Sequence, residues 1–200
     1  AIYGYAHVPW MSKRQVMIKD ADLPDSETRF ALALLAKRRL QAEGFETIGI
    51  DHFALPQDAL FKAHQDGQVR RNFQGYTDDQ SQTLIGFGAS AISKFPQGFL
   101  QNAVATSAYQ DRVTQTQFAA HKGYAITPSD KLTALIVEDL LCRFSLETSR
   151  LAADFPEHQN TVRAMSVALM RKFPDVFFIS PKGLKMHDWA KPLVRIIANA

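Results

Sequence analysis

Ile2-Tyr3-Gly4-Tyr5-Ala6-His7-Val8 is a short, mostly apolar stretch near the start of the chain, and it predicts a buried β-strand. A helix is expected to begin at Asp25 or Ser26 and to run to about Glu43. A second strand is expected over residues 46–50. Strand, helix and strand in this order predict a β-α-β unit with parallel strands, in which functional residues follow the C-terminal ends of the strands.

Residues 57–126 alternate between helical and extended patterns. In chain order, we expect a short helix over 57–66, an irregular segment at 71–77, a third strand over 83–93, a loop over 94–102, a helix over 103–115 and an extended segment over 118–126. The first part of the chain is therefore predicted to have an α/β fold.

The composition changes at Thr127-Pro128-Ser129-Asp130, which is a strong helix start because proline falls in the first turn and an acidic residue follows three positions after the threonine. This helix is expected to reach about Phe144. A helix over 157–172, a hairpin over 176–186 and a last helix over 188–198 complete a mostly helical, winged-helix-like module. We therefore predict two domains, residues 1–115 and residues 116–200.

Composition excludes several classes of protein. The 200 residues are 46% hydrophobic and 10% aromatic, which is typical of a folded domain. No apolar run approaches the roughly 20 residues that span a bilayer, so we expect no membrane association. The single cysteine, Cys142, excludes an internal disulfide and favours a reducing cytoplasm. A formal net charge of +3 permits an anionic ligand without requiring nucleic acid.

Two groups of residues carry possible chemistry in the first half. Asp51 and His52 directly follow a predicted strand, where a carboxylate beside an imidazole can exchange protons or orient a ligand, or can simply satisfy loop backbone. If the strands are neighbours, His7 and His52 face one pocket. The segment 71–77 combines a cation, amides, two aromatic rings and a glycine, a mixture suited to a polar or anionic ligand or to an ordinary anchored loop.

Other patterns are weaker. Gly86-Phe87-Gly88-Ala89-Ser90-Ala91 lacks the features of a dinucleotide or phosphate loop, and its small residues favour close approach of a planar ligand to a strand, with Ile92 as an apolar face. The histidines have no zinc-like spacing, so no metal site is predicted. Lys182 and Lys185 on the predicted hairpin are expected to be solvated, because no basic recognition helix accompanies them.

Five motifs in order resemble oxygen-independent coproporphyrinogen III oxidases, which are radical S-adenosylmethionine enzymes of haem biosynthesis. The motifs are Tyr5-Ala6-His7-Val8-Pro9, Lys19-Asp20-Ala21-Asp22-Leu23-Pro24, Gly49-Ile50-Asp51-His52-Phe53-Ala54, residues 71–77 and residues 84–93. The resemblance implies late β/α units of a partial radical-SAM barrel, followed by that family's C-terminal helical domain. A haem-chaperone branch shares the architecture and is the alternative, but residues 51–54 and 72–77 favour the oxidase.

The resemblance implies the conversion of two propionates of coproporphyrinogen III to vinyl groups, giving protoporphyrinogen IX with loss of carbon dioxide and transfer of an electron to an acceptor. It implies S-adenosylmethionine and a [4Fe-4S] cluster as cofactors. The family holds that cluster through three cysteines, and this chain has one. We therefore expect the chain to correspond to the C-terminal part of such an enzyme, to be monomeric and to be inactive alone.

The resemblance also suggests site residues. Ala6 and Ile92 match the family positions that contact S-adenosylmethionine. Gln74 is a candidate for a polar contact in the site, and Arg71 and His52 are candidates for recognition of the substrate propionates, where a charge-assisted hydrogen bond suits a carboxylate.

Overall fold

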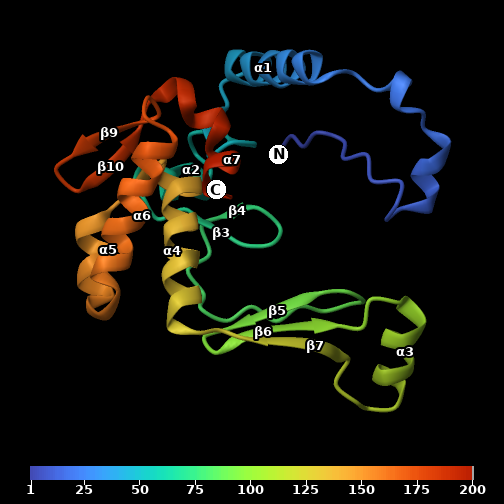
Figure 1. Ribbon diagram of the computed structural model, residues 1–200. Helices are drawn as coiled ribbons and strands as arrows, with labels where there is room; N and C mark the ends of the chain where they lie inside the picture. The colour runs from blue at the N-terminus through green and yellow to red at the C-terminus, as the bar shows by residue number, and fades with distance from the viewer. Residues whose placement is uncertain (200) are drawn as a thin grey trace. The chain divides into compact units, whose positions relative to one another are not determined.

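The computed structural model describes residues 1–199 of the chain (Figure 1). Contacts between residues divide it into two compact units, Ala1–Val69 and Arg70–Ala200. The fold is mixed α/β, as predicted, but its sheets are small and open, with two or three strands each.

Unit 1 contains a long helix, a small hairpin and a short helix. Helix α1 (Ser26–Ala42) begins at Asp25, whose carboxylate accepts a hydrogen bond from the backbone N–H of Thr28. Strands β1 (Glu46–Ile48) and β2 (His52–Ala54) are antiparallel. Helix α2 (Ala59–Gln65) follows the hairpin. Two short 3₁₀ segments, η1 (Lys13–Met17) and η2 (Asp20–Asp22), come before α1.

Two predictions for unit 1 are wrong. Residues 2–8 are extended but form no strand, because a strand needs the paired backbone of a neighbouring segment. A backbone hydrogen bond of 2.8 Å from the Ile2 N–H to the Asp51 carbonyl joins them to the hairpin. Most of these residues are exposed. The strand after α1 is not part of a parallel pair, because Gly49, with φ of 60°, lets the chain reverse and pair Ile48 with His52.

Unit 2 begins with a hairpin and a three-stranded sheet. Strands β3 (Arg70–Arg71) and β4 (Tyr76–Thr77) form the hairpin. Strands β5 (Ile92–Phe95), β6 (Gly98–Asn102) and β7 (Ala120–Ala125) form an antiparallel sheet in that order. Helix α3 (Thr106–Thr114) connects β6 to β7 and lies at the far end of this sheet in Figure 1.

The predicted third strand over 83–93 and the predicted loop over 94–102 are both wrong. The chain reverses near Ser90, which has φ of 61°, so that Leu84 pairs with Lys94 as an isolated bridge. The segment assigned to a loop is instead strand β6, because its backbone is paired on both sides. The predicted domain boundary at 115/116 passes through this sheet, since β7 pairs with β6.

The C-terminal part contains the best-packed core. Its elements are α4 (Pro128–Arg143), β8 (Ser145–Leu146), α5 (Thr148–Asp154), η3 (Pro156–His158), α6 (Gln159–Lys172), β9 (Phe177–Ser180), β10 (Gly183–Met186), η4 (Asp188–Leu193) and α7 (Val194–Ala198). The predicted helix start at Thr127 is confirmed as a capping box. The hairpin over 176–186 is also confirmed, whereas β8 and α5 were not predicted.

A buried charge network joins α4 to α5. Asp139 is fully buried, and its carboxylate accepts hydrogen bonds from Arg150 at 2.7 Å to both oxygens and from Arg143 at 2.8 Å. Leu140 and Leu151, beside this network, are 2% and 0% exposed. The network therefore fixes the position of α4, which carries contacts to the β3–β4 hairpin. Within residues 1–199, every helix is too short or too polar to cross a bilayer.

Candidate functional site

The segment 71–77, which the sequence singles out, is the tip and both strands of the β3–β4 hairpin. The Asn72 side chain closes the loop by accepting hydrogen bonds from the backbone N–H groups of Gln74 at 2.8 Å and Gly75 at 3.1 Å. Gly75 has φ of 151°, which favours glycine. This geometry holds Phe73 and Gln74 at the exposed tip of a rigid turn.

The base of the hairpin is anchored to α4. The Tyr76 hydroxyl donates a hydrogen bond of 2.8 Å to the backbone carbonyl of Leu141, and Tyr76 is 6% exposed. The Arg70 side chain lies 3.5 Å from a Glu138 carboxylate oxygen. The guanidinium of Arg71 lies over the Tyr76 ring, 4.6 Å from its centre. Arg71, a candidate for binding propionate, therefore contacts the anchoring ring of Tyr76. No pattern in the sequence predicts this contact.

The tip of the hairpin contacts the β5–β6–β7 sheet, above which it lies in Figure 1. The rings of Phe73 and Phe99 meet edge to face with their centres 5.5 Å apart. Because Phe99 pairs with Lys94 and Tyr124, and Ile92 lies two residues from Lys94 on the same strand, all of these side chains share one face of the sheet. The structure thus brings the hairpin tip to the face that carries Ile92.

The loop between the bridge at Leu84 and strand β5 is held by side chains. Asn102 donates to the backbone carbonyls of Gly86 and Gly88, at 3.1 and 3.0 Å, and the Gly86 N–H donates to the Ser93 hydroxyl. A Cβ on Gly86 would lie 2.9 Å from the carbonyl oxygen of Ile92. Gly86 therefore admits the chain's own backbone, whereas a Cβ on Gly88 would have no atom within 4 Å.

In unit 1, Asp51 and His52 form a close pair. The Asp51 carboxylate lies 2.7 Å from Nδ1 of His52, and both side chains are largely buried. Since a carboxylate only accepts hydrogen bonds, Nδ1 of His52 is the donor to Asp51. The Tyr3 ring meets the imidazole edge to face at 6.0 Å. This arrangement orients the imidazole.

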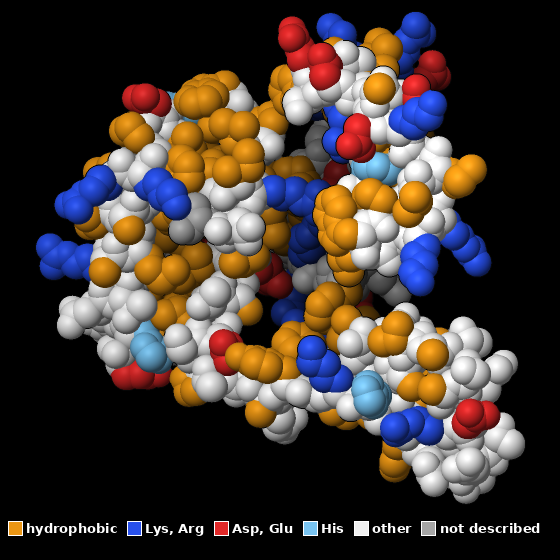
Figure 2. Space-filling view, turned by 45° about the vertical axis from the view of Figure 1, so that its right-hand side comes forward, with side chains coloured by type: hydrophobic (Ala, Val, Ile, Leu, Met, Phe, Trp, Pro, Cys, Tyr) orange, Lys and Arg blue, Asp and Glu red, His pale blue; other side chains and the backbone are white. Residues whose placement is uncertain are grey.

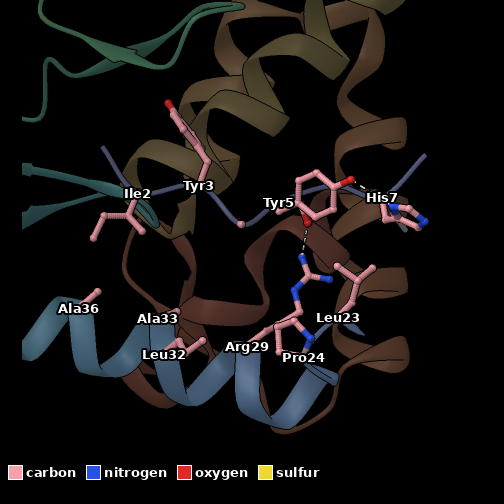
Figure 3. Close-up of a pocket in the computed structure, with 11 residues that line it drawn as sticks. Ile2, Tyr3, Tyr5, His7, Leu23, Pro24, Arg29, Leu32, Ala33 and Ala36 are labelled. Carbon is pink, nitrogen blue, oxygen red and sulfur yellow. Dashed lines mark hydrogen bonds between the residues drawn. The ribbon is translucent and has the colours of Figure 1, made fainter. Parts of the chain in front are cut away.

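A cavity of about 400 Å³ lies between the N-terminal segment and α1 (Figure 3). Its polar lining groups include Arg29, which donates to the Tyr5 carbonyl at 3.0 Å, and His7, whose Nδ1 lies 3.1 Å from the Tyr5 hydroxyl. His7 lines this cavity, and His52 is not among its lining residues.

Ala6 is exposed beside this cavity. The Gln15 amide donates to the Ala6 carbonyl at 3.1 Å and accepts from the Val8 N–H at 2.6 Å, which fixes the backbone around Ala6 without a partner strand. Ala6 and His52 belong to unit 1, whereas Arg71, Gln74 and Ile92 belong to unit 2, and each set is ordered within its own unit.

The part of the chain that the structure describes holds no candidate binding site for an iron–sulfur cluster. No group of three or more possible metal ligands occurs among residues 1–199. Cys142 is buried in α4, and burial raises the pKa of its thiol to about 12, so it is a poor thiolate ligand. Ile92, by contrast, offers a half-buried apolar side chain on an accessible sheet face, which fits van der Waals contact with a cofactor such as S-adenosylmethionine.

Comparison with solved structures shows that the fold is similar to part of a radical SAM enzyme. The coproporphyrinogen III oxidase HemN of Escherichia coli superposes with a TM-score of 0.87 and 30% sequence identity over 98% of this chain and 45% of that one. No family model matches the chain.

Curated relatives give the same result. The oxygen-independent coproporphyrinogen III oxidase of Paracoccus denitrificans is 41% identical over 199 residues, and coproporphyrinogen III oxidase, anaerobic 1, of Cereibacter sphaeroides is 43% identical over 200 residues. Each alignment covers 100% of this chain and 44% of the relative. The chain is therefore homologous over its whole length to oxygen-independent coproporphyrinogen III oxidases, which confirms the resemblance, and it spans under half of their length.

Proposed function

We propose that this chain forms part of an oxygen-independent coproporphyrinogen III oxidase, the part that contributes one wall of the substrate and cofactor site. The observation that carries the proposal is the 41% identity to the Paracoccus denitrificans enzyme over the whole of this chain, which covers 44% of that enzyme. The segment 71–77, one of the five motifs of that resemblance, is an anchored hairpin with an exposed tip, as a rigid wall of a binding site requires.

The activity would be the oxidative decarboxylation of two propionates of coproporphyrinogen III to vinyl groups, giving protoporphyrinogen IX. S-adenosylmethionine, with a [4Fe-4S] cluster that this chain does not ligate, would supply the radical chemistry. The residues of this chain would bind, orient and shield. Ile92 and Ala6 would contact S-adenosylmethionine, one through its apolar side chain and the other through exposed backbone.

The polar candidates would have different roles. Gln74, at the exposed hairpin tip, is suited to a direct contact with a ligand. His52, oriented by Asp51, would present Nε2 to a substrate group. Arg71 would act mainly by stiffening the hairpin, because its guanidinium lies over the Tyr76 ring. We also infer that residues 127–199 form a winged-helix-like module, supported by the strand order β8-β10-β9 and by the helices α4, α5 and α6, which precede the β9–β10 hairpin.

A chimaera tests this function. The chain would be joined to the part of the Paracoccus denitrificans enzyme that it does not cover, and coproporphyrinogen III would be supplied anaerobically with S-adenosylmethionine, a reductant and an electron acceptor. We expect protoporphyrinogen IX from the chimaera and none from the 200-residue chain. A folded, cluster-loaded chimaera without turnover would contradict the proposal, and stable haem uptake without vinyl formation would favour the haem-chaperone alternative.

The same chimaera tests Gln74. Gln74→Ala is expected to lower turnover or weaken substrate binding, whereas the control Gln110→Ala, on the exposed surface of α3, is expected to have no effect. Unchanged kinetics in Gln74→Ala would remove this residue from the site.

A further inference from the structure

The face of the β5–β6–β7 sheet that meets the hairpin tip combines aromatic rings with lysines. Two rows of paired residues cross it: Lys94, Phe99 and Tyr124 in one row, and Ile92, Gln101 and Lys122 in the next. Directly paired residues of antiparallel strands point to the same side, so all six side chains belong to this face. Orange hydrophobic and blue basic side chains lie side by side along the arm at the lower right of Figure 2.

The two lysines of this face lack acidic partners. Among residues 1–199, neither Lys94 nor Lys122 forms a salt bridge, although each carries a full positive charge. The carboxylate near the edge of the face, Asp130, is already engaged, because one of its oxygens accepts hydrogen bonds from Thr127 and from the Tyr124 hydroxyl. Within the described part of the chain, the two lysines of this face therefore have no ion-pair partner, and they lie beside the exposed rings of Phe73 and Tyr124.

Its aromatic groups come from two elements far apart in sequence. Phe99 lies at the middle of the sheet, and Phe73, 63% exposed, stands against it from the hairpin tip. The hairpin is fixed by Asn72 and Tyr76, so Phe73 needs no reordering to present its ring. A flat heteroaromatic ring stacking on this pair would bring acidic substituents towards the lysines.

We propose that this face binds the propionate-bearing pyrrole rings of a tetrapyrrole, with Phe73 and Phe99 against a ring and with Lys94 and Lys122 pairing with two separate carboxylates. This deepens, and rests on, the proposed function. Two strand spacings across the sheet and a shift of two residues along it place the two lysine Cα atoms about 12 Å apart. Flexible lysine side chains can close part of that span, so both can contact carboxylates of one macrocycle.

Binding of coproporphyrin III, a stable tetracarboxylate, to the 200-residue chain tests the proposal by fluorescence titration. The variants are Lys94→Met and Lys122→Met, which keep the apolar stems and remove the charges. Each is expected to weaken binding about 3- to 10-fold, the range for a partly solvated charge-assisted contact. Lys94→Arg and Lys122→Arg should retain most of the affinity. Lys185→Met removes an exposed lysine on strand β10, in the other three-stranded sheet, and this variant should bind as the parent does.

Further measurements test whether the lysines of this face bind the carboxylates of the tetrapyrrole. The tetramethyl ester of coproporphyrin III should bind with an affinity that the lysine substitutions leave unchanged, and the salt dependence of acid binding should fall in the double variant. Parent-like affinity in Lys94→Met and Lys122→Met, or no binding to the parent chain, would overturn the assignment of this face. Failure of the chimaera to turn over would instead refute the proposed function, because that assay does not depend on which face binds substrate.

Discussion

Removing the buried charge of Asp139 should loosen the candidate site without touching it. The carboxylate is 0% exposed and accepts three charge-assisted hydrogen bonds from Arg143 and Arg150, at 2.7 to 2.8 Å. Breaking a buried ion pair costs about 3–5 kcal/mol, and both arginines can still reach water, so Asp139→Asn should cost about 3 kcal/mol. For a chain of this size, that loss lowers the melting temperature by roughly 6–12 °C.

Urea titration and thermal melting measure the loss. The matched control is Asp154→Asn, because Asp154 also lies near Arg150, at 3.6 Å, but its side chain is 50% exposed. The control should cost under about 0.5 kcal/mol. Because α4 carries Glu138 and Leu141, which hold the hairpin, amide exchange of residues 70–77 should accelerate in Asp139→Asn. A melting temperature of Asp139→Asn equal to that of Asp154→Asn would refute this reasoning.

Three more predictions follow from single contacts. Tyr76→Phe removes the hydrogen bond to the Leu141 carbonyl and should cost about 1 kcal/mol in urea unfolding. Gly86→Ala places a methyl group 2.9 Å from the Ile92 carbonyl oxygen, so it should cost about 1–3 kcal/mol in urea unfolding. Burial raises the pKa of the Cys142 thiol from 9.0 to about 12, so this thiol ionises first in the unfolded chain as pH rises. Stability in urea unfolding should therefore fall from about pH 9 upward, by about 1 kcal/mol at pH 10, and Cys142→Ala should reduce that slope.

Local signals predicted the helices well. The start of α4 follows from Thr127, Pro128 and Asp130 alone, because a capping box is made by residues within one turn. The β9–β10 hairpin was predicted for the same reason, since the turn residues at Pro181 and Gly183 lie between the strands that they join. Such elements carry most of their own determinants within a few residues.

Strands that depend on distant partners were not predicted. Residues 2–8 have the composition of a buried strand, but composition does not supply the neighbouring backbone, and in this structure they remain extended and mostly exposed. Strand β6 was assigned to a loop because Gly98 and Pro96 interrupt its apolar pattern, yet its pairing to both β5 and β7 makes it the middle of the sheet. A strand forms where distant backbone pairs with it, as for β6, and residues 2–8 form none.

The candidate site likewise has features that the sequence predicts and features that depend on the fold. The sequence alone marked the segment 71–77 as unusual, because its mixture of residues is visible without a fold. The sequence could not assign different roles within it: Asn72 closes the loop, Tyr76 anchors it, and Phe73 reaches Phe99. No local motif marks Lys94 or Lys122, since only the register of β5, β6 and β7 puts them on one face. A binding surface assembled from paired strands is therefore found by register and not by motif, and it is on that register that the tetrapyrrole assignment depends.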